Sequence, residues 1–316
     1  MRKFSSYILI WMKGVGMGAA DVRPGLSGGT IAFLTGIYQE LIDSIRSIDL
    51  KAMKLLFTGK IGQFWKKING NFLVAVLLGI LVSFFSLAKL MTYLMVHHPV
   101  PLWAFFFGLI ISSAFLILKD IKFNFSAIVS LMCGLAIGVA ICLLSPAETP
   151  DAWWFIFLCG AIAICAMILP GISGSFILLL LGKYQYMLGA LTALDFPTIL
   201  LFAAGALLGI IAFSHFLSWL LKNYYNMAIS LLSGIMIGSL VKVWPWQLVL
   251  ENGVSRPTLP NNPDLLISSQ IDFIPAAHLG HIPEAVIFAV IGILIVVTLE
   301  LLSRKMSKKK EVEKVS

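Results

Sequence analysis

The chain reads PGLSGG at residues 24–29 and PGISGS at residues 170–175, an offset of 146 positions. Aligned without gaps, residues 24–45 and 170–191 share nine identities in 22, among them Gly36 with Gly182. Because the offset is close to half of the 316 residues, we infer two copies of one unit. Each copy interrupts a very apolar region with proline, glycine and serine. In a membrane protein, such paired interruptions indicate a binding site.

The composition is that of an integral membrane protein. Hydrophobic residues make up 59% of the chain and charged residues 12%, and the mean hydropathy is +0.96. The four cysteines lie inside apolar segments, with neither the spacing of a metal site nor that of a disulfide framework. We therefore expect no metal and no cofactor.

Hydropathy predicts an all-α fold. Two regions, 4–45 and 152–191, are apolar arms on either side of the breaks, and we expect each to be a re-entrant helical hairpin. Six other segments have about the 20 apolar residues that a spanning helix needs: 71–96, 101–118, 125–145, 197–221, 226–243 and 284–303. The first repeat is then 1–145 and the second 146–303, with an added external loop at 244–283 and a basic tail at 304–316.

Basic residues orient the predicted spans. Of the 23 Lys and Arg residues, 18 fall on one side of the six-span arrangement, many of them in residues 46–67 and in the tail. By the positive-inside rule that side is cytoplasmic, and so are both termini. The net charge of +8 is thus a topology signal, and we expect no nucleic-acid partner. Three spans follow each hairpin, and since three is odd, the two repeats have inverted topology.

The breaks have the chemistry of an anion site. Ser27 and Ser173 stand where an N-cap belongs, and the free N–H groups of a helix start attract anions. Serine and threonine hydroxyls could add donors, and the glycines let a ligand approach the backbone. The candidate binding residues are Arg23, Ser27, Gly28, Gly29, Thr30, Ser173, Gly174 and Ser175.

Only the first break carries charge, in Asp21 and Arg23. Charges are costly in a bilayer and functional by default. The planar guanidinium of Arg23 suits a phosphate or carboxylate, because it can bond two oxygens at once. The second repeat has Leu169 at the position of Arg23. The alternative is an Asp21–Arg23 pair that neutralises itself and holds the hairpin tip.

Four further polar residues are candidates for site support. Lys89 and His215 lie at nearly equivalent places in two spans and could face one cavity, although Lys89 could instead snorkel to the external surface. Gln39 and Gln185 lie on the second arms, where they could brace the hairpins by interhelical hydrogen bonds.

The energy source stays open. A proton carried by Asp21 or Glu40, a sodium ion held by unwound carbonyls, and passive equilibration are all compatible with the sequence. Glu40 could instead lie at the cytoplasmic interface.

GMGAADVRPGLSGGT at residues 16–30 and LPGISGS at residues 169–175 resemble the bacterial polyprenyl-phosphate transporter family. The resemblance covers about residues 10–303 and shows no departure in either motif. It implies a transporter that moves undecaprenyl phosphate, a polyprenyl-phosphate lipid, from the outer to the inner leaflet of the cytoplasmic membrane. The carrier would thereby be recycled for peptidoglycan and other envelope polymers. A phosphate head at the hairpin tips and a rocking of the repeats by alternating access would fit this function.

Two other functions remain open. A transporter of a small soluble anion would use the same hairpin tips. An undecaprenyl-pyrophosphate phosphatase-like enzyme has less support, because in that family an arginine follows the serine and an acidic cluster accompanies it. Here Gly28 and Gly174 follow the serines, and Ser27 has no base nearby in the sequence to activate it.

Overall fold

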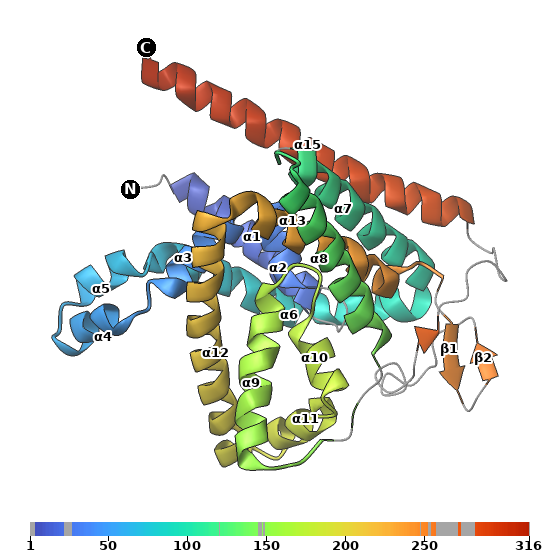
Figure 1. Ribbon diagram of the computed structural model, residues 1–316, viewed down its shortest axis with the longest axis horizontal. Helices are drawn as coiled ribbons and strands as arrows, with labels where there is room; N and C mark the ends of the chain where they lie inside the picture. The colour runs from blue at the N-terminus through green and yellow to red at the C-terminus, as the bar shows by residue number, and fades with distance from the viewer. Residues whose placement is uncertain are drawn as a thin grey trace. The chain divides into compact units, whose positions relative to one another are not determined.

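The computed structural model describes residues 4–21, 27–119, 121–144, 147, 149–246, 248–251, 254–256, 271–272 and 282–315 (Figure 1). Contacts divide the chain into two compact units. The first unit contains Met1–Thr92 and Ile121–Ser239, and the second contains Tyr93–Asp120 and Leu240–Ser316. Both breaks belong to the first unit.

The duplicated segments fold alike. The first comprises α1 (Phe4–Asp21), α2 (Gly28–Leu34) and α3 (Tyr38–Arg46), and the second comprises α9 (Trp153–Ile168), α10 (Gly174–Leu180) and α11 (Tyr184–Thr192). The bounds of α2 and α10, and those of α3 and α11, differ by the 146 residues of the sequence repeat. The duplication in sequence is therefore a duplication of local structure.

The second arm of each predicted hairpin is two short helices rather than one. Gly36 and Gly182 separate them with φ angles of 69° and 64°, a backbone region that glycine adopts without steric cost. The bend between α10 and α11 is 110°. A seven-residue helix such as α10 is about 10 Å long, roughly a third of the hydrocarbon core of a bilayer.

Long helices occupy all six predicted spans: α6 (Gly70–His97), α7 (Pro99–Lys119), α8 (Phe125–Leu143), α12 (Phe196–Asn223), α13 (Tyr225–Gly238) with the 3-10 helix η1 (Ser239–Val243), and α15 (Ile282–Val315). Among the described residues, four helices are long and apolar enough to cross a membrane, or up to six if two bent pairs each count as one span. The tail predicted from residue 304 continues α15 as helix, because its lysines and glutamates are good helix formers.

Each first arm packs closely on the first long helix of its own repeat. A Cβ atom added to Gly14 of α1 would lie 2.4 Å from the carbonyl oxygen of Val76 in α6. A Cβ atom at Gly160 of α9, the equivalent position, would lie 2.2 Å from the carbonyl oxygen of Phe202 in α12. Figure 1 shows α9 and α12 side by side. These glycines allow the backbones to touch.

The other long helices pair between the two halves of the sequence. α8 packs on α13 in the first unit, and α7 packs on α15 in the second (Figure 1). A Cβ atom at Gly134 of α8 would lie 2.1 Å from the carbonyl oxygen of Leu231, and one at Gly108 of α7 would lie 2.1 Å from that of Ala289. In both pairs, the second span of one predicted repeat meets the third span of the other.

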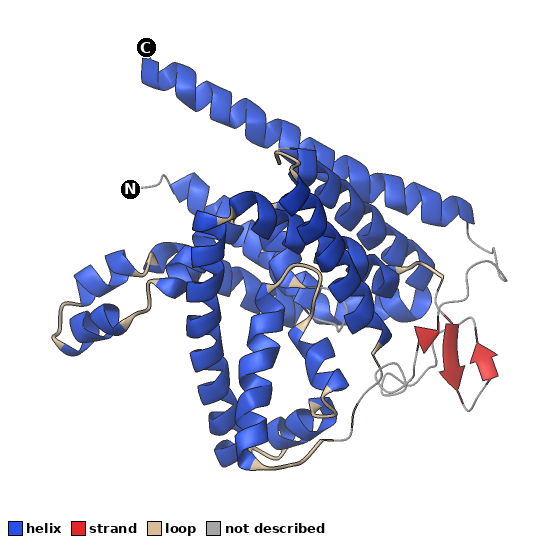
Figure 2. Cartoon of the chain, in the orientation of Figure 1, coloured by secondary structure: helices blue, strands red, loops and turns tan. Residues whose placement is uncertain are grey.

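Two smaller features complete the described chain. Helices α4 (Leu50–Phe57) and α5 (Ile61–Lys67) pack on each other, and the Asp49 carboxylate caps α4 and pairs with Lys67. The predicted external loop contains a sheet of order β2-β1-β3, with β1 (Leu248–Glu251) antiparallel to both β2 (Val254–Arg256) and β3 (Ile271–Asp272) (Figure 2). Outside this sheet, the regular elements of the described residues are helical, as predicted.

Candidate functional site

The two breaks lie against each other in the first unit. The Ser27 hydroxyl is within hydrogen-bonding distance of the carbonyl oxygens of Met167 (3.1 Å) and Leu169 (3.3 Å). Gly171 N donates to the Thr30 hydroxyl at 2.8 Å. Both Ser27 and Thr30 are buried. Residues about 140 positions apart thus form one polar junction where two long apolar helices end.

Only glycine fits at position 29 of this junction. A Cβ atom there would lie 2.5 Å from the carbonyl oxygen of Ile168 and 2.9 Å from that of Met167. These backbone atoms belong to the end of α9 and cannot move aside as a side-chain tip would. Gly29 therefore serves the contact between the breaks.

The first helix start is closed by its own break. Gly28 N donates to Asp21 Oδ1 at 2.7 Å, Gly29 N donates to the Ser27 hydroxyl at 3.1 Å, and Thr30 N donates to the Ser27 carbonyl at 2.9 Å. Ser27 is thus the N-cap that the sequence predicts. The Asp21 carboxylate occupies the position that an external anion would take at this helix start.

The second helix start has no such acceptors among the residues that the structure describes. Ser173 is the N-cap residue of α10 by position, but its hydroxyl bonds with that of Ser175 at 2.8 Å and does not cap the helix. The N–H groups of Gly174 and Ser175 have no hydrogen-bond acceptor among the described residues. The halves therefore differ in available donors as well as in charge.

Gly28 and Gly174 have equivalent neighbours in the two halves. A Cβ atom at Gly28 would lie 3.1 Å from the Met17 carbonyl oxygen, and one at Gly174 would lie 2.6 Å from the Ala163 carbonyl oxygen. Met17 and Ala163 are themselves 146 residues apart. Both glycines let the short helix lie against the first arm of its own hairpin.

The remaining predicted site residues are placed as follows. Arg23 and the side chain of Lys89 lie outside the described residues. Asn69 donates to Glu40 Oε1 at 2.9 Å. Gln39 and Gln185 are exposed, and their side chains form no hydrogen bond among the described residues, so the bracing role stays a prediction. His215 Nδ1 lies 2.8 Å from the Ile211 carbonyl oxygen of its own helix.

Sequence reasoning missed two lysines whose side chains lie beside the ends of the short helices α2 and α10. Lys13 of α1 donates to the Thr35 carbonyl after α2 at 2.6 Å. Lys183 follows α10, is buried, donates to the Thr149 carbonyl at 2.7 Å and pairs with Asp151. Lys183 aligns with Ile37 and Lys13 with Cys159, so the gapless alignment does not show that the two lysines have similar places.

It also missed a cluster of four polar residues between α3 and α12: Asp43, Arg46, Ser218 and Lys222. Arg46 and Lys222 are among the 18 basic residues that orient the predicted spans, and the sequence predicts no other role for them. The signal that would have found them is their spacing, since Asp43 precedes Arg46 by one helical turn and Ser218 precedes Lys222 by one.

A model of a family described as undecaprenyl phosphate translocase-like matches residues 17–258. A polyprenyl-phosphate transporter of Vibrio cholerae serotype O1 is 43% identical over 266 residues, covering 82% of this chain and 86% of the relative. A polyprenyl-phosphate transporter of Staphylococcus aureus is 34% identical over 253 residues, covering 74% and 85%. No solved structure matches the chain.

Proposed function

The chain belongs to the undecaprenyl phosphate translocase-like family, and we propose that it carries undecaprenyl phosphate from the outer to the inner leaflet of the bacterial cytoplasmic membrane. The names of both relatives agree with a transporter rather than an enzyme. The observation that carries the proposal is the contact between the two breaks, which joins two helix ends at a glycine-rich polar junction. In the cell this transport would return the lipid carrier for peptidoglycan and other envelope polymers.

The phosphate head would bind at this junction. Arg23, in the first break, would form paired hydrogen bonds with the phosphate oxygens. The open N–H groups of Gly174 and Ser175 would add donors, while Ser173 and Ser175 would contribute hydroxyls. Ser27, Gly28, Gly29 and Thr30 would shape the opposite wall.

Asp21 gives the site a route to ion coupling. Its carboxylate accepts the Gly28 N–H, so proton uptake by Asp21 would weaken that bond and free a donor for the phosphate. A proton gradient could then drive the cycle, with sodium as the alternative ion. Imposing the pH and sodium gradients separately on proteoliposomes distinguishes the two, and Asp21→Asn should abolish the response to the pH gradient if the proton is used.

Alternating access between inverted repeats would expose the junction to each side in turn. Two observations support this arrangement. The hairpin elements recur with one offset, and the long helices form the reciprocal pairs α7 with α15 and α8 with α13. Such reciprocal pairing is expected of two units related by a two-fold operation. Each hairpin would be re-entrant, since its returning helix is too short to cross the bilayer.

Both termini would be cytoplasmic. The concentration of basic residues at 46–67 and in the tail supports this orientation. Exposed tryptophans support it as well. Trp153 and Trp154 begin α9, whereas Trp65 lies in the basic segment 46–67 and Trp219 lies near Lys222 at the end of α12. Tryptophan is enriched at membrane interfaces, so the two groups mark two levels.

A transport assay with two substrates tests the substrate class. Proteoliposomes would be given either a fluorescent polyprenyl phosphate in one leaflet or labelled inorganic phosphate in the external solution. We expect faster exchange of the lipid than in protein-free vesicles, and no uptake of phosphate. Uptake of inorganic phosphate without lipid exchange would instead assign the site to a soluble anion.

A further inference from the structure

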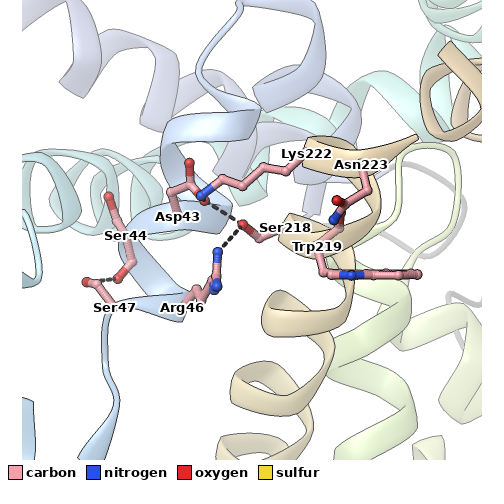
Figure 3. A network of polar contacts seen from close by, with 8 residues as sticks. All are labelled: Asp43, Ser44, Arg46, Ser47, Ser218, Trp219, Lys222 and Asn223. Carbon is pink, nitrogen blue, oxygen red and sulfur yellow. Dashed lines mark hydrogen bonds and ion pairs between the residues drawn. The ribbon is translucent and has the colours of Figure 1, made fainter. Parts of the chain in front are cut away.

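A charged network joins α3 to α12, and none of its residues belongs to the junction of the breaks (Figure 3). The Ser218 hydroxyl, which is buried, donates to Asp43 Oδ1 at 2.6 Å. Arg46 Nη1 donates to the same hydroxyl at 2.9 Å, and Lys222 Nζ lies 3.4 Å from Asp43 Oδ1. Figure 3 shows the two cationic side chains converging on Asp43 and Ser218 from the two helices.

The network has more positive than negative charge. Lys222 pairs with the single carboxylate of Asp43, and Arg46 is linked to that carboxylate through the Ser218 hydroxyl, which leaves a net charge of +1 on the four residues. In the ion pairs Lys67–Asp49 and Lys183–Asp151, by contrast, the charges balance one to one. Of the five N–H donors of Arg46, one is used among the described residues, for Ser218. Further oxygens could therefore be bound here.

The aromatic side chains beside the network are of the kind enriched at a membrane surface. Trp219 is half exposed, stacks on Phe216 with ring centroids 6.3 Å apart, and meets Tyr224 edge-on at 5.6 Å. Exposed tryptophan and tyrosine near the end of an apolar helix are typical of the headgroup level. The Lys222 side chain is 51% exposed and that of Asp43 40%, so both are accessible at this level.

We propose that Arg46 and Lys222 form a second binding site for a phosphomonoester lipid headgroup, in the leaflet at the basic end of α12. Asp43 acts as an internal competitor while the site is empty, since it pairs directly with Lys222 and is linked to Arg46 through the Ser218 hydroxyl. A phosphomonoester fits because it carries a charge of about −1.5 to −2 at neutral pH, more than a phosphodiester lipid. By the positive-inside rule this leaflet is the inner one, so the site would receive the head after translocation.

The inference rests on the proposed function but is tested separately from it. Native mass spectrometry of the detergent-purified full chain would count bound farnesyl phosphate, with farnesol, inorganic phosphate and phosphatidylglycerol as the comparison probes. We expect two farnesyl phosphates on the wild-type protein. We expect one on Arg46→Gln/Lys222→Gln, with affinity for the lost site reduced by about tenfold or more, because two charge-assisted interactions are removed.

The sign of the Asp43→Asn effect separates a binding site from a structural link. If Asp43 competes with the headgroup, Asp43→Asn raises the affinity of this site. If the network only fastens α3 to α12, the same change lowers the affinity or leaves it unchanged, and the proposal is wrong. Lys51→Gln/Lys54→Gln is the matched control, since it removes two exposed cations from α4 and should leave two farnesyl phosphates bound.

Other outcomes are also decisive. Equal binding of phosphatidylglycerol would make the site a general anionic-lipid contact and overturn the proposed ligand class, as would binding of inorganic phosphate alone. If Arg46→Gln/Lys222→Gln still binds two farnesyl phosphates while the wild-type protein translocates lipid, the inference fails and the proposed function stands. If the lipid binds at this site but is not translocated, the proposed function fails.

Discussion

Thr30 and Gly171 lie 141 residues apart in the chain, and the hydrogen bond from Gly171 N to the Thr30 hydroxyl joins the two breaks. Gly171 lies in the break between α9 and α10, where a buried backbone N–H group needs an acceptor outside the helical ladder. The Thr30 hydroxyl is the acceptor that the fold provides. Ser27 adds its bonds to the two carbonyls that end α9.

Thr30→Val tests the strength of this bond. The change keeps the shape of the side chain but leaves Gly171 N without its acceptor, which should lower the free energy of unfolding by about 1–3 kcal/mol. Thermal unfolding in detergent measures the effect. Thr35→Val is the control, because the Thr35 hydroxyl bonds only to carbonyls of its own helix and should cost much less.

Gly29→Ala tests the close approach of the breaks. The added Cβ would lie 2.5 Å from the Ile168 carbonyl oxygen, so the tips must separate, at a cost of about 1–3 kcal/mol typical of overpacking. We expect lower stability and slower lipid translocation in proteoliposomes. Gly62→Ala has open space around its Cβ and should change neither. Normal translocation by Gly29→Ala would contradict a functional junction.

At the scale of elements, the duplicated turns are alike in backbone conformation but not in surroundings. Gly36 and Gly182 both have positive φ. A Cβ atom at Gly36 would meet nothing within 4 Å, whereas one at Gly182 would lie 2.5 Å from the Ala147 carbonyl oxygen. The segment before α9 therefore lies over the turn of the second hairpin, where Ala147 N also donates to the Leu180 carbonyl.

The two turns make a matched pair of predictions. Gly36→Ala should cost about 1–2 kcal/mol of stability, the price of a left-handed conformation for an L-residue. Gly182→Ala should cost more, because it adds a backbone clash to the same conformational term. Equal melting temperatures of the two variants would show that the segment before α9 does not lie over the turn at Gly182.

The α4–α5 pair should be sensitive to acid. A hydrogen bond from Lys67, and a second from Ala52 N, hold the pKa of Asp49 below its usual value. A lowered pKa means that Asp49 stabilises the fold above its unfolded pKa of about 3.9, and that this contribution is lost as the pH falls through the lower folded value. The protection factors for amide exchange in residues 50–67, taken relative to the intrinsic rate at each pH, should therefore fall below about pH 4, and Asp49→Asn should remove most of that fall.

At the scale of the whole molecule, the sequence predicts the long helices and the duplicated breaks because both leave strong local signals. Apolar runs near 20 residues mark the helices, and identical letters at one offset mark the breaks. Breaks within the second arms were missed, since Gly36 alone does not distinguish a turn from a tolerated helical glycine. The bond from Gly171 to Thr30 and the link between α3 and α12 at Ser218 depend on tertiary packing, because spacing along one helix shows only which of its residues share a face.

Lipid translocation by the wild-type protein and by Arg23→Ala, in one set of proteoliposomes, tests the central claim most directly. A fluorescent polyprenyl phosphate in one leaflet would be followed by quenching from outside, with Lys54→Ala as a control that removes a cation elsewhere. We expect the wild-type and control proteins to exchange the lipid between leaflets at the same rate. Arg23→Ala should be slower by a factor of about 10 or more, because a charge-assisted bond to the phosphate is lost. Exchange by Arg23→Ala at the wild-type rate, or none by the wild-type protein, would contradict the account.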